Sequence, residues 1–173
     1  IVFSGSEDLG NGMKAGFKLS GSPDGSSDGF GDDQWLALSG DFGTVKMGRM
    51  ETFSESKVRA TAANDASDVL SNEVAGNIGE RSNGVIAYSS PKMSGLQFHA
   101  AATTLDSTTS QTDDFDNTDI GISYTNGPLT VMVSQADGYG NDGASTPDLD
   151  LTKTKETSIA VKYVMGDFTV AAV

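Results

Sequence analysis

A short turn sequence recurs five times in this chain, each time between two segments in which apolar and polar residues alternate. The turns are rich in Gly, Asn and Asp, and Gly and Asn tolerate the positive φ angles of tight hairpins. Much longer polar segments separate one hairpin from the next. Short turns at one end of a sheet and long connections at the other are typical of an antiparallel up-and-down β-barrel that crosses a membrane. The five turns are residues 6–12, 39–43, 90–95, 125–128 and 165–168.

Apolar residues take every second position in the segments between these turns, as in 13–19 and 120–124. A period of two is the signature of a β-strand. In a membrane barrel the apolar face meets lipid and the polar face lines the lumen, whereas in a soluble β-sandwich the apolar face is the core. Tyr88, Tyr124 and Tyr163 lie on apolar faces just before short turns, where a membrane barrel carries its interfacial aromatic residues. We therefore expect an all-β transmembrane barrel with a wet interior.

The composition restricts the class of protein further. Apolar residues make up 36% of the chain, which is low for a packed soluble core but suits strands that are apolar on one face only. The chain has no cysteine, which excludes a disulfide scaffold and a cysteine-based metal site. Its formal charge of −13 argues against nucleic acid as a partner. No segment approaches the roughly 20 apolar residues that a membrane helix needs.

More than half of the 24 acidic residues gather in three windows, 20–33, 103–119 and 135–150, which contain no Lys or Arg. We interpret these windows as solvated loops that carry charge, and we expect no cofactor and no dedicated metal site. The alternative is that the carboxylates bind Ca²⁺ or Mg²⁺, although no complete ligand spacing is present. The chain would then be a secreted calcium-binding β-sandwich or adhesin module.

The sequence gives little indication of a catalytic site. The single histidine, His99, has no nucleophile or carboxylate at a recognisable spacing. No Gly-x-Ser-x-Gly elbow and no phosphate-binding glycine loop followed by a helix occurs. We interpret His99 as a residue that lines the lumen and Trp35 as a packing residue, and we do not expect an enzyme.

Three stretches resemble the general diffusion porins of the Gram-negative outer membrane: residues 5–15 (GSEDLGNGMKA), 38–49 (LSGDFGTVKMGR) and 81–91 (RSNGVIAYSSP). The resemblance implies a sixteen-stranded barrel. Residues 1–173 would hold its second to eleventh strands as a single domain, because both ends of the chain fall within a strand pattern and look like those of an interior fragment. It also implies an integral outer-membrane protein, a homotrimer in contact with lipid and lipopolysaccharide.

By the same resemblance, the function would be passive diffusion of ions and small hydrophilic solutes across the outer membrane. Members of the family fold their third external loop into the pore, and residues 51–80 fall at that place. Acidic side chains on this constriction loop face basic side chains on the barrel wall, which creates an electric field across the passage. The acidic character of the chain predicts a mild cation preference. A channel specific for sugars or phosphate, and a structural barrel filled by side chains, are the alternatives.

The resemblance places two arginines at the roots of the constriction loop. Arg49 ends the strand before it, Arg81 begins the strand after it, and both match wall arginines of the family. Arg49 shares the parity of Met47, which would aim it at lipid unless a bulge at Gly48 turns it inward. The alternative is an arginine that anchors the loop root by ion pairs. The expected basic wall consists of Arg49, Arg81, Lys14, Lys18 and Lys46, and the expected acidic loop residues are Asp65, Asp68 and Glu73.

Overall fold

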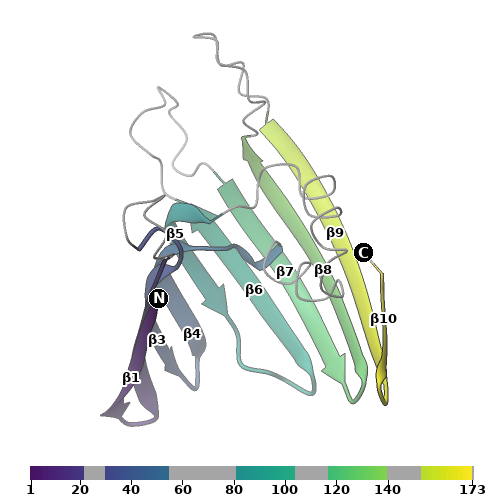
Figure 1. The fold of residues 1–173 in the computed structure, drawn as a ribbon, viewed down its shortest axis with the longest axis horizontal. Coiled ribbons are helices and arrows are strands. Elements are labelled where there is room, and N and C mark those ends of the chain that lie inside the picture. The colour runs from purple at the N-terminus through teal and green to yellow at the C-terminus, as the bar shows by residue number, and fades with distance from the viewer. Residues whose placement is uncertain (22–29, 55–80, 104–116, 140–152, 173) are drawn as a thin grey trace.

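The computed structural model describes residues 1–21, 30–54, 81–103, 117–139 and 153–172. They form ten strands that pair antiparallel in the order of the sequence, which makes one up-and-down sheet (Figure 1). The all-β fold predicted from the alternation is confirmed. No helix in these ranges is long and apolar enough to cross a membrane. The strands are β1 (Val2–Gly10), β2 (Met13–Ser20), β3 (Gln34–Gly40), β4 (Gly43–Met50), β5 (Ser82–Ser89), β6 (Leu96–Thr103), β7 (Asn117–Asn126), β8 (Leu129–Tyr139), β9 (Lys153–Met165) and β10 (Phe168–Ala172).

Five tight connections lie where the turn sequences predict them, and they gather at the lower end of the sheet in Figure 1. They join β1 to β2, β3 to β4, β5 to β6, β7 to β8 and β9 to β10. The backbone takes positive φ in these turns mostly at Asn and Gly, as at Asn11 (52°) and Gly12 (75°), and also at Ser94 (52°). A residue with a Cβ is strained in this region unless it is Asn or Asp. This local requirement is why the turn sequences locate the hairpins.

The two faces of the sheet differ in chemistry. Directly paired residues share a face, so the register assigns each side chain. The outer face exposes large apolar side chains, namely Phe17, Leu36, Met47, Ile86, Phe98, Ile120 and Ile159. The inner face carries basic, polar and small residues, among them Lys18, Trp35, Lys46, Ala87, His99, Gly121 and Ser134.

A β-bulge interrupts the pairing of β4 with β5. Gly48 pairs with Val85 and Met50 pairs with Ser82, so two residues of β5 oppose Arg49 alone. A bulge at Gly48 was considered only as a way to turn Arg49 inward, and a register shift does lie beside Gly48. The extra residue, however, belongs to β5, where Gly84 takes a φ of 63°, a conformation typical of bulge glycines.

Apolar packing on the inner face is limited to small clusters. Met50, Val85 and Ala101 are buried together beside the bulge, and Trp35 packs against them. The prediction that Trp35 is a packing residue is therefore confirmed.

Candidate functional site

The chain turns across the inner face as soon as it leaves β4. Residues 51–54 run from the end of β4 past β5 and β6 toward β7 (Figure 1). The Phe53 ring is buried and stacks on His99 of β6, with the ring centroids 3.9 Å apart and the planes 14° apart. Phe53 also forms one apolar cluster with Met132 of β8 and Ala160 of β9. The described start of segment 51–80 thus lies against the inner face.

Asp119 of β7 holds the next residue, Ser54. One carboxylate oxygen of Asp119 accepts a hydrogen bond from the Ser54 backbone N–H at 2.7 Å, and the other accepts one from the Ser54 hydroxyl at 2.8 Å. Asp119 is only 3% exposed. Because a buried carboxylate is costly unless it accepts hydrogen bonds, Ser54 and Asp119 stabilise each other's position.

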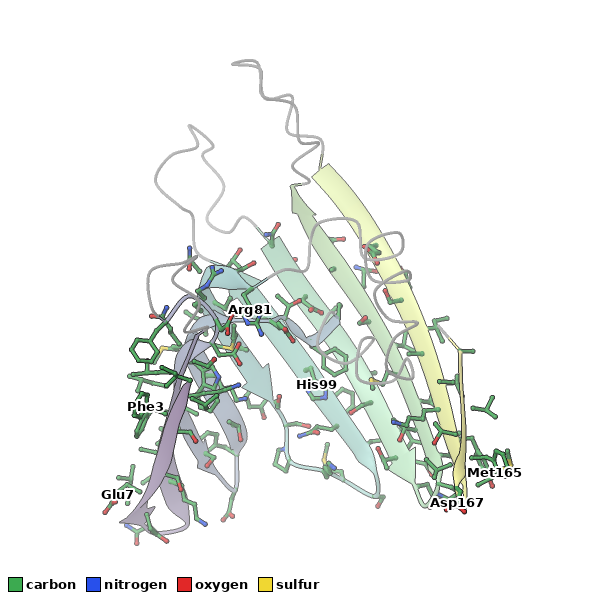
Figure 2. All side chains as sticks on the ribbon, viewed as in Figure 1. Phe3, Glu7, Arg81, His99, Met165 and Asp167 are labelled. Carbon is green, nitrogen blue, oxygen red and sulfur yellow. The ribbon has the colours of Figure 1, made fainter. Side chains whose placement is uncertain are left out.

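His99 lies midway along β6, on the inner face (Figure 2). Its Nδ1 is 3.0 Å from the Ser89 hydroxyl and its Nε2 is 3.2 Å from the Ser123 hydroxyl. The prediction that His99 lines the lumen needs a correction. The residue has the expected face, but Phe53 covers its ring and leaves it 8% exposed.

Five charged residues meet where segment 51–80 leaves and rejoins the sheet, and we call them the loop-root cluster. Arg81 lies 3.0 Å from Asp33, 3.3 Å from Glu51 and 3.9 Å from Asp32, measured between guanidinium nitrogens and carboxylate oxygens. The Lys18 ammonium lies 2.5 Å from the second oxygen of Asp33. The cluster therefore ties the end of β2 to both roots of the segment.

The acidic and basic groups of this cluster stabilise one another's charged forms. Burial raises the pKa of Asp33, but hydrogen bonds from Lys18 and Arg81 outweigh it, so the pKa lies below the ordinary value of 3.8. Burial lowers the pKa of Arg81, yet the hydrogen bond to Asp33 and the negative charges of Glu51 and Asp32 raise it overall. Asp33 and Arg81 therefore remain ionised at neutral pH.

A hollow lined by both polar and apolar residues lies against Glu51 and Phe53. It measures about 330 Å³. The Lys46 ammonium at its edge lies 4.5 Å from the centroid of the Trp35 ring, within the range of a cation–π interaction. The other residues that line the hollow include Glu51, Phe53, Ser89, Gln97 and His99.

A comparison with models of protein families identifies the family of this chain. A model described as "Gram-negative porin" matches residues 1–173, the whole chain. The chain belongs to the Gram-negative porin family. Family membership places it in the outer membrane of a Gram-negative bacterium.

One curated relative and two solved structures are similar to this porin. It is 29% identical to outer membrane porin protein 32 of Delftia acidovorans over 178 residues, which cover 94% of this chain and 49% of the relative. An anion-selective porin from Comamonas acidovorans superposes with a TM-score of 0.72 at 23% identity, over 98% of this chain and 55% of that one. Salmonella typhi OmpF, in a complex with daunomycin, gives 0.71 at 13% identity, again over 98% and 55%. The chain thus spans about half the length of these relatives, and the solved structures bear on the fold alone.

Arg49 lies apart from the loop-root cluster. It pairs in register with Gln34 and so stays on the face of Met47, as the parity predicts. Its Nε donates to the Gly31 carbonyl at 2.8 Å and its Nη1 donates to the Asn83 side-chain oxygen at 3.0 Å. The bulge places Asn83 opposite Arg49, which brings the two side chains into contact. The role of Arg49 as a pore-wall residue stays a prediction.

The other predicted site residues divide into three groups. Arg81 and Lys18 meet through Asp33, and Lys46 lies beside the hollow. Lys14 pairs with Ser39 close to the hairpin turns, at some distance along the strand from these groups. The predicted acidic residues Asp65, Asp68 and Glu73 lie outside the described residues. The division into a basic wall and an acidic loop, and the single-domain assignment of 1–173, therefore stay predictions.

Sequence reasoning missed the residues that hold the loop start. Asp119 was assigned to an acidic loop window, whereas it is the third residue of β7 and faces inward. Phe53 carries no turn or strand pattern to mark it. The inward parity of Asp119 with Gly121 could have identified Asp119 as a wall residue, since a lone acid on a strand's polar face points at the lumen.

The described residues contain no group of three or more His, Asp or Glu that could hold a metal ion. Much of the three acidic windows lies outside the described ranges. The expectation of no cofactor, and the alternative that Ca²⁺ or Mg²⁺ binds there, both stay untested.

Proposed function

We propose that this porin is a passive diffusion channel for ions and small hydrophilic solutes across the outer membrane. The observation that carries the proposal is the path of residues 51–54, which leave β4 and pack against the inner face of β6 to β9. A sheet that is polar on this face, and apolar and exposed on the other, suits a wall between water and lipid. A segment that crosses the inner face narrows the aqueous passage.

Charges at the narrowing would select among solutes. The inner face of the described strands carries the basic groups Lys14, Lys18, Lys46 and Lys162, with Arg81 at the loop root. We propose that these lysines, Arg81 and Arg49 belong to the basic wall, and that acidic side chains of segment 51–80 face them. Opposite charges across a narrow passage create a field that orients polar solutes, whereas apolar solutes must displace ordered water to enter. The acidic partners in this proposal are Asp65, Asp68 and Glu73.

We further propose that the intact protein is a homotrimer, surrounded by outer-membrane lipid and lipopolysaccharide. Family membership supports a channel, and we propose no enzymatic activity and no cofactor. Ca²⁺ or Mg²⁺ bound by the acidic windows is a weaker proposal, supported only by their charge.

The sign of the ion preference follows from competing charges. The formal charge of −13 favours cations, and we propose a mild cation preference on that basis. Two observations favour the opposite sign. Basic side chains line the described inner face, and a protein of similar fold is described as an anion-selective porin.

The test is to insert the intact protein into a planar lipid bilayer and to record single-channel currents and the reversal potential in a salt gradient. We expect large stepwise openings, often in groups of three, and the sign of the potential measures the ion preference. A silent bilayer, with protein that stays soluble without detergent, would contradict the channel and favour the calcium-binding module.

A further inference from the structure

A second hollow lies on the outer face of the sheet, over β6 to β9, and we call it the outer hollow. It measures about 340 Å³. Four of the apolar side chains that line it are 43–56% exposed. Because an apolar gap does not hold ordered water and this face meets hydrocarbon, an acyl chain fits the outer hollow. The outer-face residues that line it are Phe98, Ile120, Ile122, Val133, Gln135 and Thr157.

The edge of the outer hollow nearest the long connections is polar. Gln135 pairs in register with Thr157 there, and the next pair on the same face, about 7 Å further along the strands, is Asp137 with Lys155. The Lys155 ammonium lies 3.8 Å from Asp137 Oδ2, and the Lys155 side chain is 63% exposed. A charged pair with an accessible ammonium group therefore stands beside an apolar hollow.

The height of Lys155 on β9 matches a boundary of the membrane. Tyr163 is on the same face of β9, close to the short turn, and is 43% exposed. Tyrosines of this kind mark the membrane interface. Lys155 precedes Tyr163 by eight residues, which is about 27 Å along a strand and about 20 Å of height in a tilted strand, against an apolar band about 25 Å tall. Lys155 therefore lies close to the opposite interface, at the level of the headgroups of the extracellular leaflet, because the long connections of such barrels face outward.

One oxygen of Asp137 lacks a hydrogen-bond donor. Asp137 Oδ1 is buried and has no hydrogen-bond partner among the described residues. An enclosed carboxylate oxygen is costly without a donor, and a hydroxyl group of a lipid headgroup supplies one. The Lys155 ammonium beside it suits a phosphate group. Phosphate and hydroxyl groups on a sugar that also carries acyl chains are the chemistry of lipid A, the membrane anchor of lipopolysaccharide.

We propose that the outer face of β7 to β9 holds one lipopolysaccharide molecule at a defined site. An acyl chain fills the outer hollow, a phosphate of lipid A binds Lys155, and a sugar hydroxyl donates to Asp137. The site rests on the proposed function, because it needs the sheet to stand in the outer membrane as a channel wall. It differs from general lipid contact in that it depends on particular side chains.

The first test measures the binding of diphosphorylated lipid A to the intact, delipidated protein in detergent by native mass spectrometry. We expect one tightly bound copy per chain. Lys155→Gln should weaken this binding about fivefold, whereas Lys155→Arg keeps the positive charge and should bind as wild type does. The control is Lys92→Gln, because Lys92 is exposed in the turn between β5 and β6, at the opposite end of the sheet (Figure 1). It should leave the binding unchanged.

A second pair of variants tests the outer hollow itself. Val133 lines the hollow, whereas Val161 is on the same face of the sheet and is not one of the residues that line it. The two valines are similarly exposed, at 43% and 38%. Val133→Trp fills the hollow with an indole ring, so we expect it to weaken the binding of lipid A. Val161→Trp adds the same ring elsewhere on the face and should bind lipid A as wild type does.

Competition with phosphatidylglycerol separates a lipid A site from a site for any lipid that carries a phosphate. We expect phosphatidylglycerol to displace lipid A poorly, because it has one phosphate and no sugar. Displacement at equal concentration would overturn the proposal. It would also be overturned if lipid A bound equally to Lys155→Gln and Lys92→Gln, or equally to Val133→Trp and Val161→Trp. Wild-type protein that binds lipid A in this way but forms no channel in a bilayer would overturn the proposed function and leave the site in place.

Discussion

At the scale of single residues, Asp33 is the centre of the loop-root cluster. It accepts a hydrogen bond from Lys18 at 2.5 Å and one from Arg81 at 3.0 Å, and its side chain is 16% exposed. Partly buried, charge-assisted pairs of this kind contribute more than exposed surface ion pairs. The cluster is therefore expected to stabilise the folded state measurably.

The lowered pKa of Asp33 predicts a pH dependence of stability. The folded protein holds this carboxylate ionised below its ordinary pKa of 3.8, so its contribution is complete above that value and is lost as the pH falls through the folded pKa. We expect the free energy of unfolding of the wild-type protein to be about 2 kcal/mol higher than that of the Asp33→Asn variant at neutral pH. Urea unfolding of the intact protein in lipid vesicles should show this gap closing below pH 3.8. If the difference in unfolding free energy between the two proteins did not change with pH, the lowered pKa of Asp33 would be contradicted.

The sequence predicted these residues only in part. Arg81 could be placed at the loop root, because it stands immediately before a strand pattern. Its partner Asp33 could not be named, since the pairing depends on the registers of β3 with β4 and of β4 with β5, and on the bulge in β5. Ion pairing at the loop root was the alternative left open for Arg49, whereas the arginine that pairs with Glu51 and Asp33 in the structure is Arg81.

At the scale of secondary-structure elements, the hairpins could be predicted from the sequence, whereas the position of the β-bulge could not. Each hairpin is encoded locally, by a period of two and a Gly or Asn turn. A bulge at Gly48 was raised only as a possibility, from the parity of Arg49, whereas the extra residue of the observed bulge lies in β5 near Gly84. Gly48 has a different role. Its φ is 140°, and a Cβ there would overlap the Gln34 carbonyl and lie 2.8 Å from the Trp35 Cα.

Gly48→Ala should therefore be strongly destabilising. The methyl group must push β3 away from β4 at a strained backbone position, and we expect a loss of about 2–3 kcal/mol. Gly12→Ala is the matched control, because Gly12 also has positive φ (75°) but nothing lies within 4 Å of its Cβ position, so backbone strain alone should cost about 1 kcal/mol. Urea unfolding in vesicles measures both. If the two variants lost the same free energy of unfolding, the close approach of β3 to Gly48 would not contribute to the cost of Gly48→Ala.

At the scale of the whole molecule, one sheet separates two environments. The outer face exposes Leu36 at 64% and Ile120 at 56%, a pattern that would be costly in water and suits lipid. The inner face carries Lys46 and the hollow lined by Glu51 and Phe53. The alternation predicted this division, whereas the loop start that crosses the inner face depends on contacts between distant residues, which no local pattern encodes.

The positions of the inner-face lysines predict how they contribute to ion selectivity, because Lys46 lines the hollow whereas Lys18 is ion-paired with Asp33. Lys18 lies 2.5 Å from Asp33, so the carboxylate compensates its charge. Lys46 lies over the Trp35 ring beside the hollow, where its charge acts on the aqueous passage. Lys46→Gln should therefore shift the reversal potential of the intact channel toward cations.

Lys18→Gln should shift the reversal potential less than Lys46→Gln. The control is Lys92→Gln, because Lys92 is exposed in the turn between β5 and β6 and should leave the potential unchanged. Bilayer recordings in a salt gradient compare the three variants directly. A larger shift for Lys18→Gln than for Lys46→Gln would contradict this account, because it would mean that the pairing with Asp33 does not screen Lys18 from the passage.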